Sequence, residues 1–124
     1  MELQRLETRG SPHDLDRMVD NAKRASEFLK ALAHESRLVI LCILAQGEKS
    51  VSELVEILGV PKANVSQHLA VMRYKGILKS RRKGVNIYYS VANPKVIDAC
   101  SLMKEVLMEH IKERGKLAET ASKH

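Results

Sequence analysis

Apolar residues in the middle of the chain recur at helical spacing in two short segments. The first segment places apolar side chains at the i, i+3, i+4 and i+7 positions of one helix face, namely Val51, Leu54, Val55 and Leu58. Gly59 ends this pattern, and Pro61 suits the first turn of a second helix, where a missing N–H costs nothing. The second segment is closed by Gly76 and has a narrow inward stripe made of Val65, Leu69 and Met72. Two short helices joined by a tight turn predict a helix-turn-helix.

Two strand-like runs follow this pair of helices. They span residues 77–82 and 85–91, and the residues between them, Lys83 and Gly84, form a tight turn that contains glycine. A helix-turn-helix followed by a β-hairpin is a winged helix. The predicted fold class is therefore mainly α with a β-hairpin wing.

Longer helical patterns flank this central unit. Apolar residues keep helical spacing for about five turns over residues 14–33. Residues 37–46 form a nearly all-apolar helix, ended by Gly47, that we expect to be central and buried. A last helix should run over residues 95–114 and end at Gly115. The first and last helices carry more apolar surface than a small core can cover, so part of each should meet a second chain.

The length of 124 residues indicates a single domain with a modest core. Residues 1–13 mix charges with glycine, serine and proline and are expected to form a mobile arm. Residues 14–114 should form the winged-helix dimer domain. Residues 115–124 lack apolar periodicity and are expected to be a disordered tail.

Positive charge is concentrated in the predicted winged helix. Between Ile57 and Ile97 there is no Asp or Glu, while eight Lys and Arg residues fall there. The whole chain has a net charge of +6, so the remainder carries −2. Basic charge confined to one supersecondary unit is typical of a surface that binds phosphates. We therefore expect double-stranded DNA as the partner.

The second helix of the pair offers suitable side chains for base contacts. Small and amide residues lie opposite its inward stripe, where Asn and Gln can pair with adenine and Ala can touch a thymine methyl group. The predicted base-facing residues are Ala63, Asn64, Ser66 and Gln67, with His68 at the edge of the stripe as a packed or phosphate-bonding residue. The predicted phosphate contacts are Lys62 and Arg73 on the helix flank and Arg81, Arg82 and Lys83 on the wing.

Four runs of residues resemble one known family. They are Leu32-Ala33-His34-Glu35-Ser36-Arg37-Leu38, Ser52-Glu53-Leu54, Val65-Ser66-Gln67-His68-Leu69 and Ile87-Tyr88-Tyr89. Over residues 20–112 the chain looks like the ArsR/SmtB-type winged-helix repressors of bacteria and archaea. The resemblance implies a homodimer built on the first and last helices that binds an operator. It also implies release from DNA when a metal ion, a metalloid, or a reactive sulfur or oxygen species acts on the protein.

The two cysteines, Cys42 and Cys100, are the candidate sensing residues. Both fall on apolar helix stripes, where a thiol can act as a small hydrophobe. In the resembled family, members that respond to sulfide-derived or oxidising species carry one cysteine in an Arg-Leu…Leu-Cys helix, as here at Cys42, and a second on the last helix. Their second cysteine lies near the position of Met108, about two turns or ~11 Å beyond Cys100. A disulfide tolerates a Cα separation of only ~4 to 7 Å. We expect a thiol switch, with core filling as the alternative.

A metal-responsive site is a second alternative. The resemblance points to an Asp-x-His and a His-x-x-Glu pair on the last helix, and the chain offers Asp98 with Cys100 and His110 with Glu113. The gap between the pairs is one residue short, which rotates the second pair by about 100°. Residues 52–58 lack the paired cysteines of arsenic-type members. We expect no metal or other cofactor.

Other classes of function find little support in the sequence. A phosphate-binding glycine loop, a metalloprotease His pair and a nucleophile elbow are all missing, so an enzyme is not expected. No apolar run reaches the ~18 residues of a membrane span, and we expect a cytoplasmic protein without a membrane partner. A winged helix that binds an acidic protein remains an alternative. RNA binding lacks an aromatic platform, since the chain has one Phe, three Tyr and no Trp.

Overall fold

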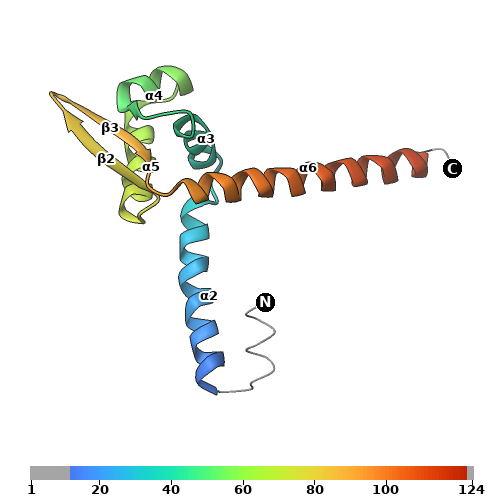
Figure 1. The fold of residues 1–124 in the computed structure, drawn as a ribbon. Coiled ribbons are helices and arrows are strands. Elements are labelled where there is room, and N and C mark those ends of the chain that lie inside the picture. Colours follow the sequence, from blue (N-terminus) through green and yellow to red (C-terminus); the bar gives the residue numbers. More distant parts are fainter. Residues whose placement is uncertain (1–11, 123–124) are drawn as a thin grey trace.

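The computed structural model describes residues 12–122 and confirms a mainly α fold with a β-hairpin wing. Its elements are α2 (Pro12–Leu32), α3 (Glu35–Leu44), β1 (Lys49–Ser50), α4 (Val51–Leu58), α5 (Lys62–Tyr74), β2 (Leu78–Lys83), β3 (Asn86–Val91) and α6 (Pro94–Ser122). Figure 1 shows a body made of α3, α4 and α5, from which α2, α6 and the wing extend in different directions.

The helix-turn-helix forms where the sequence predicts it. Ser50 and Glu53 make a capping box at the start of α4, in which the Ser50 hydroxyl accepts from the Glu53 N–H and the Glu53 carboxylate accepts from the Ser50 N–H. Gly59 ends α4 with a φ of 66°, a left-handed conformation that glycine adopts without steric cost. Pro61 is the N-cap of α5. The α5 stripe is fully buried, with Val65, Leu69 and Met72 all at 0% exposure.

The wing belongs to a three-stranded sheet, which sequence reasoning missed. The strand order is β1-β3-β2 and both pairings are antiparallel. Lys83 pairs with Asn86, so the turn consists of Gly84 and Val85, one residue later than the predicted turn at Lys83 and Gly84. Gly84 has a φ of 65° in this two-residue turn. The missed strand β1 is two residues long, and such a short run carries no detectable alternation.

The helix predicted to be buried is buried on one side only. It begins two residues earlier than expected, at Glu35, because His34 caps it by accepting the N–H of Ser36 at 3.2 Å. Ile40, Leu41 and Leu44 are buried, whereas Cys42 is exposed and Leu38 and Val39 are each 42% exposed. The prediction of a central helix holds for one face, and the other face is open in a single protomer.

The predicted boundaries at both ends of the domain are wrong. α6 continues through Gly115 to Ser122, so residues 115–122 do not form a disordered tail. A glycine inside a helix costs only about 1 kcal/mol relative to alanine, and good helix formers surround Gly115 on both sides. At the other end, α2 already includes residues 12 and 13. The remaining part of the predicted mobile arm, residues 1–11, lies outside the described residues.

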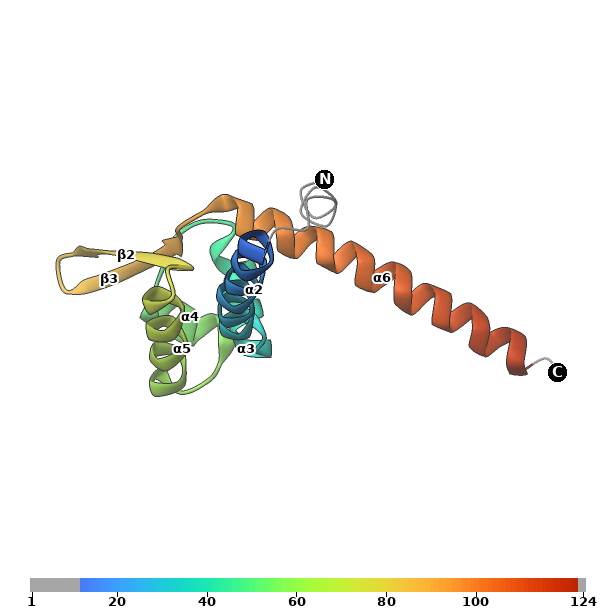
Figure 2. The same cartoon turned by 90° about the horizontal axis from the view of Figure 1, so that it is seen from below.

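Both extending helices expose apolar side chains. On α2 these are Leu15, Val19 and Leu29, and on α6 they are Leu102, Met103, Val106, Leu107, Met108, Ile111 and Leu117. α6 has 29 residues, which corresponds to a length of about 43 Å, and Figures 1 and 2 show most of it beyond the body. None of the helices within residues 12–122 combines the length and apolarity needed to cross a membrane.

Candidate nucleic-acid interface

The exposed face of α5 is the centre of the candidate interface. The buried stripe fixes the rotation of α5, so the opposite face points away from the core. The exposed residues of this face are Ala63, Asn64, Ser66, Gln67 and Ala70, with Lys62, Arg73 and Tyr74 also exposed. Figure 2 shows α5 at one side of the body below the wing. A side-chain surface that is small and polar can approach base edges closely.

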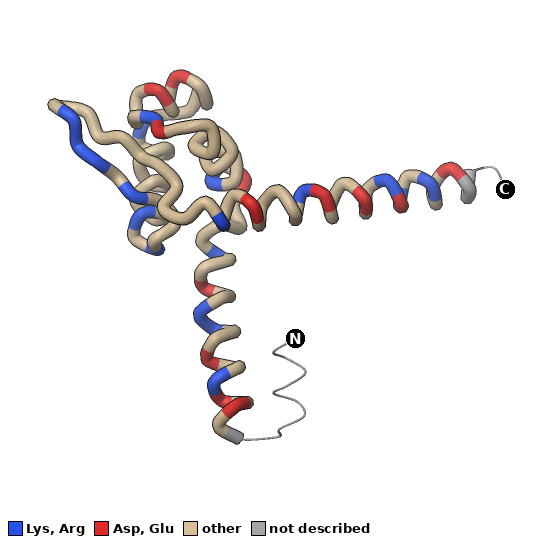
Figure 3. Tube along the Cα trace, viewed as in Figure 1, with Lys and Arg blue, Asp and Glu red and all other residues tan. Residues whose placement is uncertain are grey.

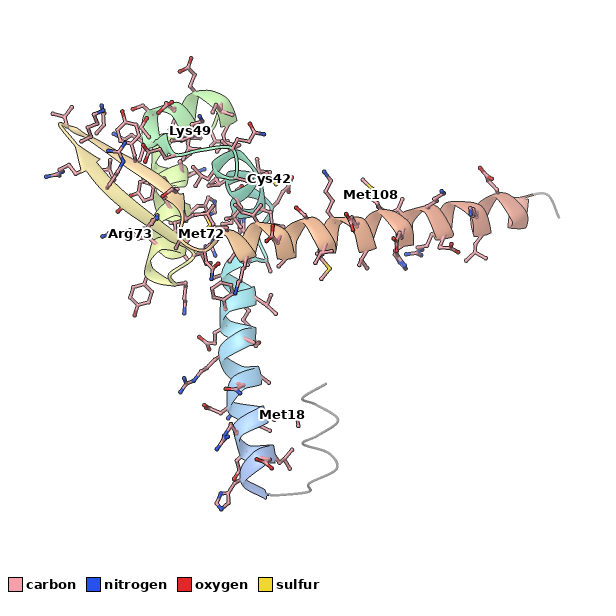
Figure 4. All side chains as sticks on the ribbon, viewed as in Figure 1. Met18, Cys42, Lys49, Met72, Arg73 and Met108 are labelled. Carbon is pink, nitrogen blue, oxygen red and sulfur yellow. The ribbon has the colours of Figure 1, made fainter. Side chains whose placement is uncertain are left out.

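Basic side chains gather on the wing beside α5. Figure 3 shows Lys and Arg following one another along β2, whereas α2 and α6 alternate basic and acidic residues. Arg73 lies in the last turn of α5, and Figure 4 places it next to the hairpin. The arrangement combines a helix face with few charges and a flanking cationic strand. This combination suits a double helix whose base edges are read between two phosphate backbones.

His68 is mostly an internal residue of this interface. Its Nδ1 accepts a hydrogen bond from Arg37 Nε at 3.2 Å, and its ring lies 4.5 Å from that of His34. Arg37 also donates from Nη1 to the carbonyl of Ala31 in the last turn of α2 at 3.1 Å. Burial lowers the pKa of His68 below its usual 6.5, and the charges of His34 and Arg37 lower it further. Thus neutral His68 ties α5 to α3 and α2.

A carboxylate from outside the basic stretch reaches the wing. Arg81 donates from Nε to Glu48 Oε2 at 2.8 Å and from Nη2 to Glu48 Oε1. The guanidinium carbon of Arg81 lies 5.3 Å from the centre of the Tyr88 ring. The hydrogen bond from Arg81 holds the pKa of Glu48 below its usual value. Sequence reasoning missed Glu48 because β1, whose pairing with β3 brings it to the wing, was not predicted.

The two cysteines lie on neighbouring elements. Cys42 is exposed on α3, and Cys100 packs partly buried against the hydrophobic core from the start of α6. Burial raises the pKa of the Cys100 thiol, and electrostatic repulsion from Cys42 raises it further. Figure 4 shows Met108 well along α6, away from Cys42. A second cysteine at that position would therefore be further from Cys42 within one protomer.

The alternative metal ligands do not converge within one protomer. Among the residues that the structure describes, no three His, Cys, Asp or Glu side chains form a group that could hold a metal ion. Asp98 and Glu113 are 15 positions apart on α6, which separates their backbones by about 22 Å. A site made of Asp98 and Cys100 with His110 and Glu113 would therefore require a second chain.

Comparison with known proteins adds independent information. The sequence profile described as "Bacterial regulatory protein, arsR family" matches residues 34–80, from the N-cap of α3 into β2. The transcriptional activator HlyU of Vibrio cholerae is 38% identical over 88 residues, which cover 71% of this chain and 82% of HlyU. The biofilm growth-associated repressor of Agrobacterium fabrum is 46% identical over 76 residues, 59% of this chain and 65% of that protein.

The chain belongs to the ArsR family. A solved relative has the same fold: the homodimeric winged helix-turn-helix domain of Mb0332 from Mycobacterium bovis matches with a TM-score of 0.71 and 32% identity, covering 79% of this chain and 91% of that one. The resemblance found in the sequence motifs is thereby confirmed. This ArsR-family chain is a DNA-binding transcriptional regulator, not an enzyme.

The lowered pKa of His68 predicts acid-sensitive stability. Because the unfolded chain binds a proton more readily at this site, stability should fall as pH drops below about 6.5. In the variant His68→Asn, the amide oxygen can accept from Arg37 but does not titrate. We expect this variant to be somewhat less stable than the unaltered chain at neutral pH. On acidification to about pH 5.5, its free energy of unfolding should fall by less than that of the unaltered chain.

Denaturant unfolding at a series of pH values measures this difference. The matched control is His110→Gln, which changes a histidine of α6 and not of α5. This variant should keep the acid sensitivity of the unaltered chain. Equal acid sensitivity in His68→Asn and the unaltered chain would contradict the assignment of neutral His68 as the tie between α5 and α3.

Proposed function

We propose that the chain is a repressor that binds an inverted-repeat operator as a homodimer, with α5 in the major groove and the wing against the flanking backbone. The observation that supports this most directly is that the exposed face of α5 lies beside the basic strand β2 of the wing (Figures 2 and 3). In a dimer, two such faces would meet half-sites about one helical turn, ~34 Å, apart or a multiple of it. The base-facing residues would be Ala63, Asn64, Ser66 and Gln67, and the phosphate contacts Lys62, Arg73, Arg82 and Lys83.

The first test separates base contacts from phosphate contacts. Gln67→Ala should reduce discrimination between operator and unrelated duplex by ~1 to 3 kcal/mol per half-site, because a bidentate base contact is lost. Arg82→Ala should weaken binding to all sequences. It should also reduce the slope of log K against log[salt] by about 0.9 per protomer. Fluorescence anisotropy at several salt concentrations, with duplexes selected from a random library, measures both quantities.

Lys104→Ala removes the same charge from α6 and serves as the control for Arg82→Ala. It should leave the salt dependence unchanged. The interface would be misplaced if Arg82→Ala and Lys104→Ala had the same effect on binding.

The proposed dimer explains the apolar surfaces of α2 and α6. Leu29 on α2 is 61% exposed and Leu107 on α6 is 52% exposed, and both lie on helices with further exposed apolar residues. A protein in water does not normally leave continuous apolar helix faces of this length uncovered. A second copy would also cover the open side of α3, because α3 belongs to the body from which α2 and α6 extend (Figure 1).

Charge substitution tests this dimer. Leu107→Glu and Leu29→Glu should weaken association by at least about two orders of magnitude, since each factor of ten is 1.4 kcal/mol and an unpaired carboxylate resists burial. Ile57, which is 54% exposed on α4, gives the matched control Ile57→Glu, which should remain dimeric. Sedimentation equilibrium supplies the measurement. A monomeric unaltered chain at micromolar concentration would refute the proposal.

Cys42 and Cys100 are the proposed sensing residues. Exposed Cys42 would react first, because the raised pKa of Cys100 keeps that thiol protonated at neutral pH. A polysulfide would transfer one sulfur atom to the Cys42 thiolate and become one sulfur shorter. Cys100 would then lose its proton and attack the Cys42 sulfur, HS⁻ would leave, and a disulfide would join α3 to α6. If the polysulfide transferred two sulfur atoms to Cys42, attack of Cys100 on the inner of the two would expel HS⁻ and leave a longer bridge of three sulfur atoms between the same helices.

Single substitutions test the thiol switch. Cys42→Ser and Cys100→Ser should each bind DNA normally but stay bound after polysulfide treatment, whereas the unaltered chain should lose affinity about 5- to 150-fold. Intact-mass measurement identifies the sulfur species. Release at the unaltered level in both variants would reduce the cysteines to core filler, and a Zn(II)-dependent release lost in His110→Ala would favour the metal alternative.

A further inference from the structure

The wing carries two adjacent arginines whose surroundings differ. Successive residues of a strand point to opposite faces of the sheet, so Arg81 and Arg82 lie on different faces. Leu78 and Arg82 are an even number of residues apart and share one face, and Leu78 is buried in the core. Their cross-strand partners are Val91 and Ile87, and Val91 also packs against the core. Arg82 therefore extends from the sheet face that is turned toward the body.

Arg81 lies on the opposite, outward face. It pairs directly across the hairpin with Tyr88, which in turn pairs with Ser50 of β1. Glu48, two residues before Ser50, lies on the same face and takes two of the five N–H donors of Arg81. The Arg81 side chain thus crosses Tyr88 from β2 and reaches the start of β1. Its positive charge is neutralised within the protomer.

We infer that Glu48 is a positioning residue that selects which wing arginine contacts DNA. Glu48 holds the Arg81 side chain across the outer face of the sheet, where it connects β2 to the start of β1. Arg82 is then the wing arginine that binds a phosphate. This inference rests on the proposed mode of DNA binding. Within residues 12–122 the structure shows no carboxylate paired with Arg82. An arginine that already makes a bidentate pair with a carboxylate gains little from a DNA phosphate. Such an arginine releases no additional counterion from the DNA.

The salt dependence of binding to a duplex of arbitrary sequence tests this inference. Each phosphate contact contributes about 0.9 to the slope of log K against log[salt], which is about a three- to fourfold change in affinity between 50 and 200 mM salt. Arg82→Ala should flatten the slope by this amount per protomer, and Arg81→Ala should leave it unchanged. Glu48→Gln should steepen the slope, because the freed Arg81 becomes available to a phosphate.

Two further variants identify the source of that steepening. The double variant Glu48→Gln with Arg81→Ala should return to the unaltered slope, because the gain depends on Arg81 and not on the loss of a negative charge. Glu56→Gln removes an exposed carboxylate of α4 that pairs with no arginine among residues 12–122, and it should not change the slope.

The inference would be overturned if Arg81→Ala flattened the slope as much as Arg82→Ala, or if Glu48→Gln behaved like Glu56→Gln. The Arg81→Ala result decides alone if Glu48→Gln unfolds, which circular dichroism would show. Failure of the unaltered chain to bind any duplex would instead overturn the proposed function, and this inference with it.

Discussion

The buried stripe of α5 is the constraint on which the rest of the structure depends. Three side chains fix the rotation of this helix against the core, and the largest fully buried residues around them are Ile40, Leu54 and Ile77. Burial of each such aliphatic side chain contributes about 1.5 to 3 kcal/mol. Because the stripe is narrow, most of the α5 surface remains free for DNA. The small core is therefore the reason that a helix of 13 residues can be both anchored and exposed.

The same small core leaves α2 and α6 without cover in one protomer. The body needs only the end of α2, where Ala31 and Leu32 are buried, and the start of α6, where Val96 and Cys100 pack. Within residues 13–119, whose burial the structure describes, the remaining turns of these two helices contribute no buried residue to the protomer. Their apolar side chains are then explained by association, and the open face of α3 follows from the same argument. The DNA-binding unit and the proposed dimer thus use separate parts of the chain.

Local patterns in the sequence predicted the elements that depend on local signals. The α4 face, the α5 stripe and the hairpin follow from spacing, glycine and proline, and all three form, with the hairpin turn one residue later than predicted. The contact between Glu48 and Arg81 could not be predicted, because it joins residues 33 positions apart through the two-residue strand β1. The prediction that α6 ends at Gly115 was wrong, because a single glycine is a weak stop signal when strong helix formers continue beyond it. The exposure of Cys42 could not be predicted either. In a helix that is apolar on all sides, the sequence does not show which face packs against the core of the protomer and which face stays exposed.

α3 connects the candidate sensing residues to the recognition helix. Arg37 in its first turn donates hydrogen bonds to His68 of α5 and to the Ala31 carbonyl of α2. Cys42 lies five residues further along the same helix, a rise of about 7.5 Å. A helix of ten residues moves largely as one body, so a bridge from Cys42 to α6 that rotated α3 would displace Arg37. His34, the N-cap of α3, also packs against His68, so a displacement of α3 would pull His68 and α5 with it through two contacts. In the proposed switch, α5 would therefore be tilted relative to the wing rather than unfolded, and the loss of alignment between the base-reading helix and Arg82 would weaken DNA binding.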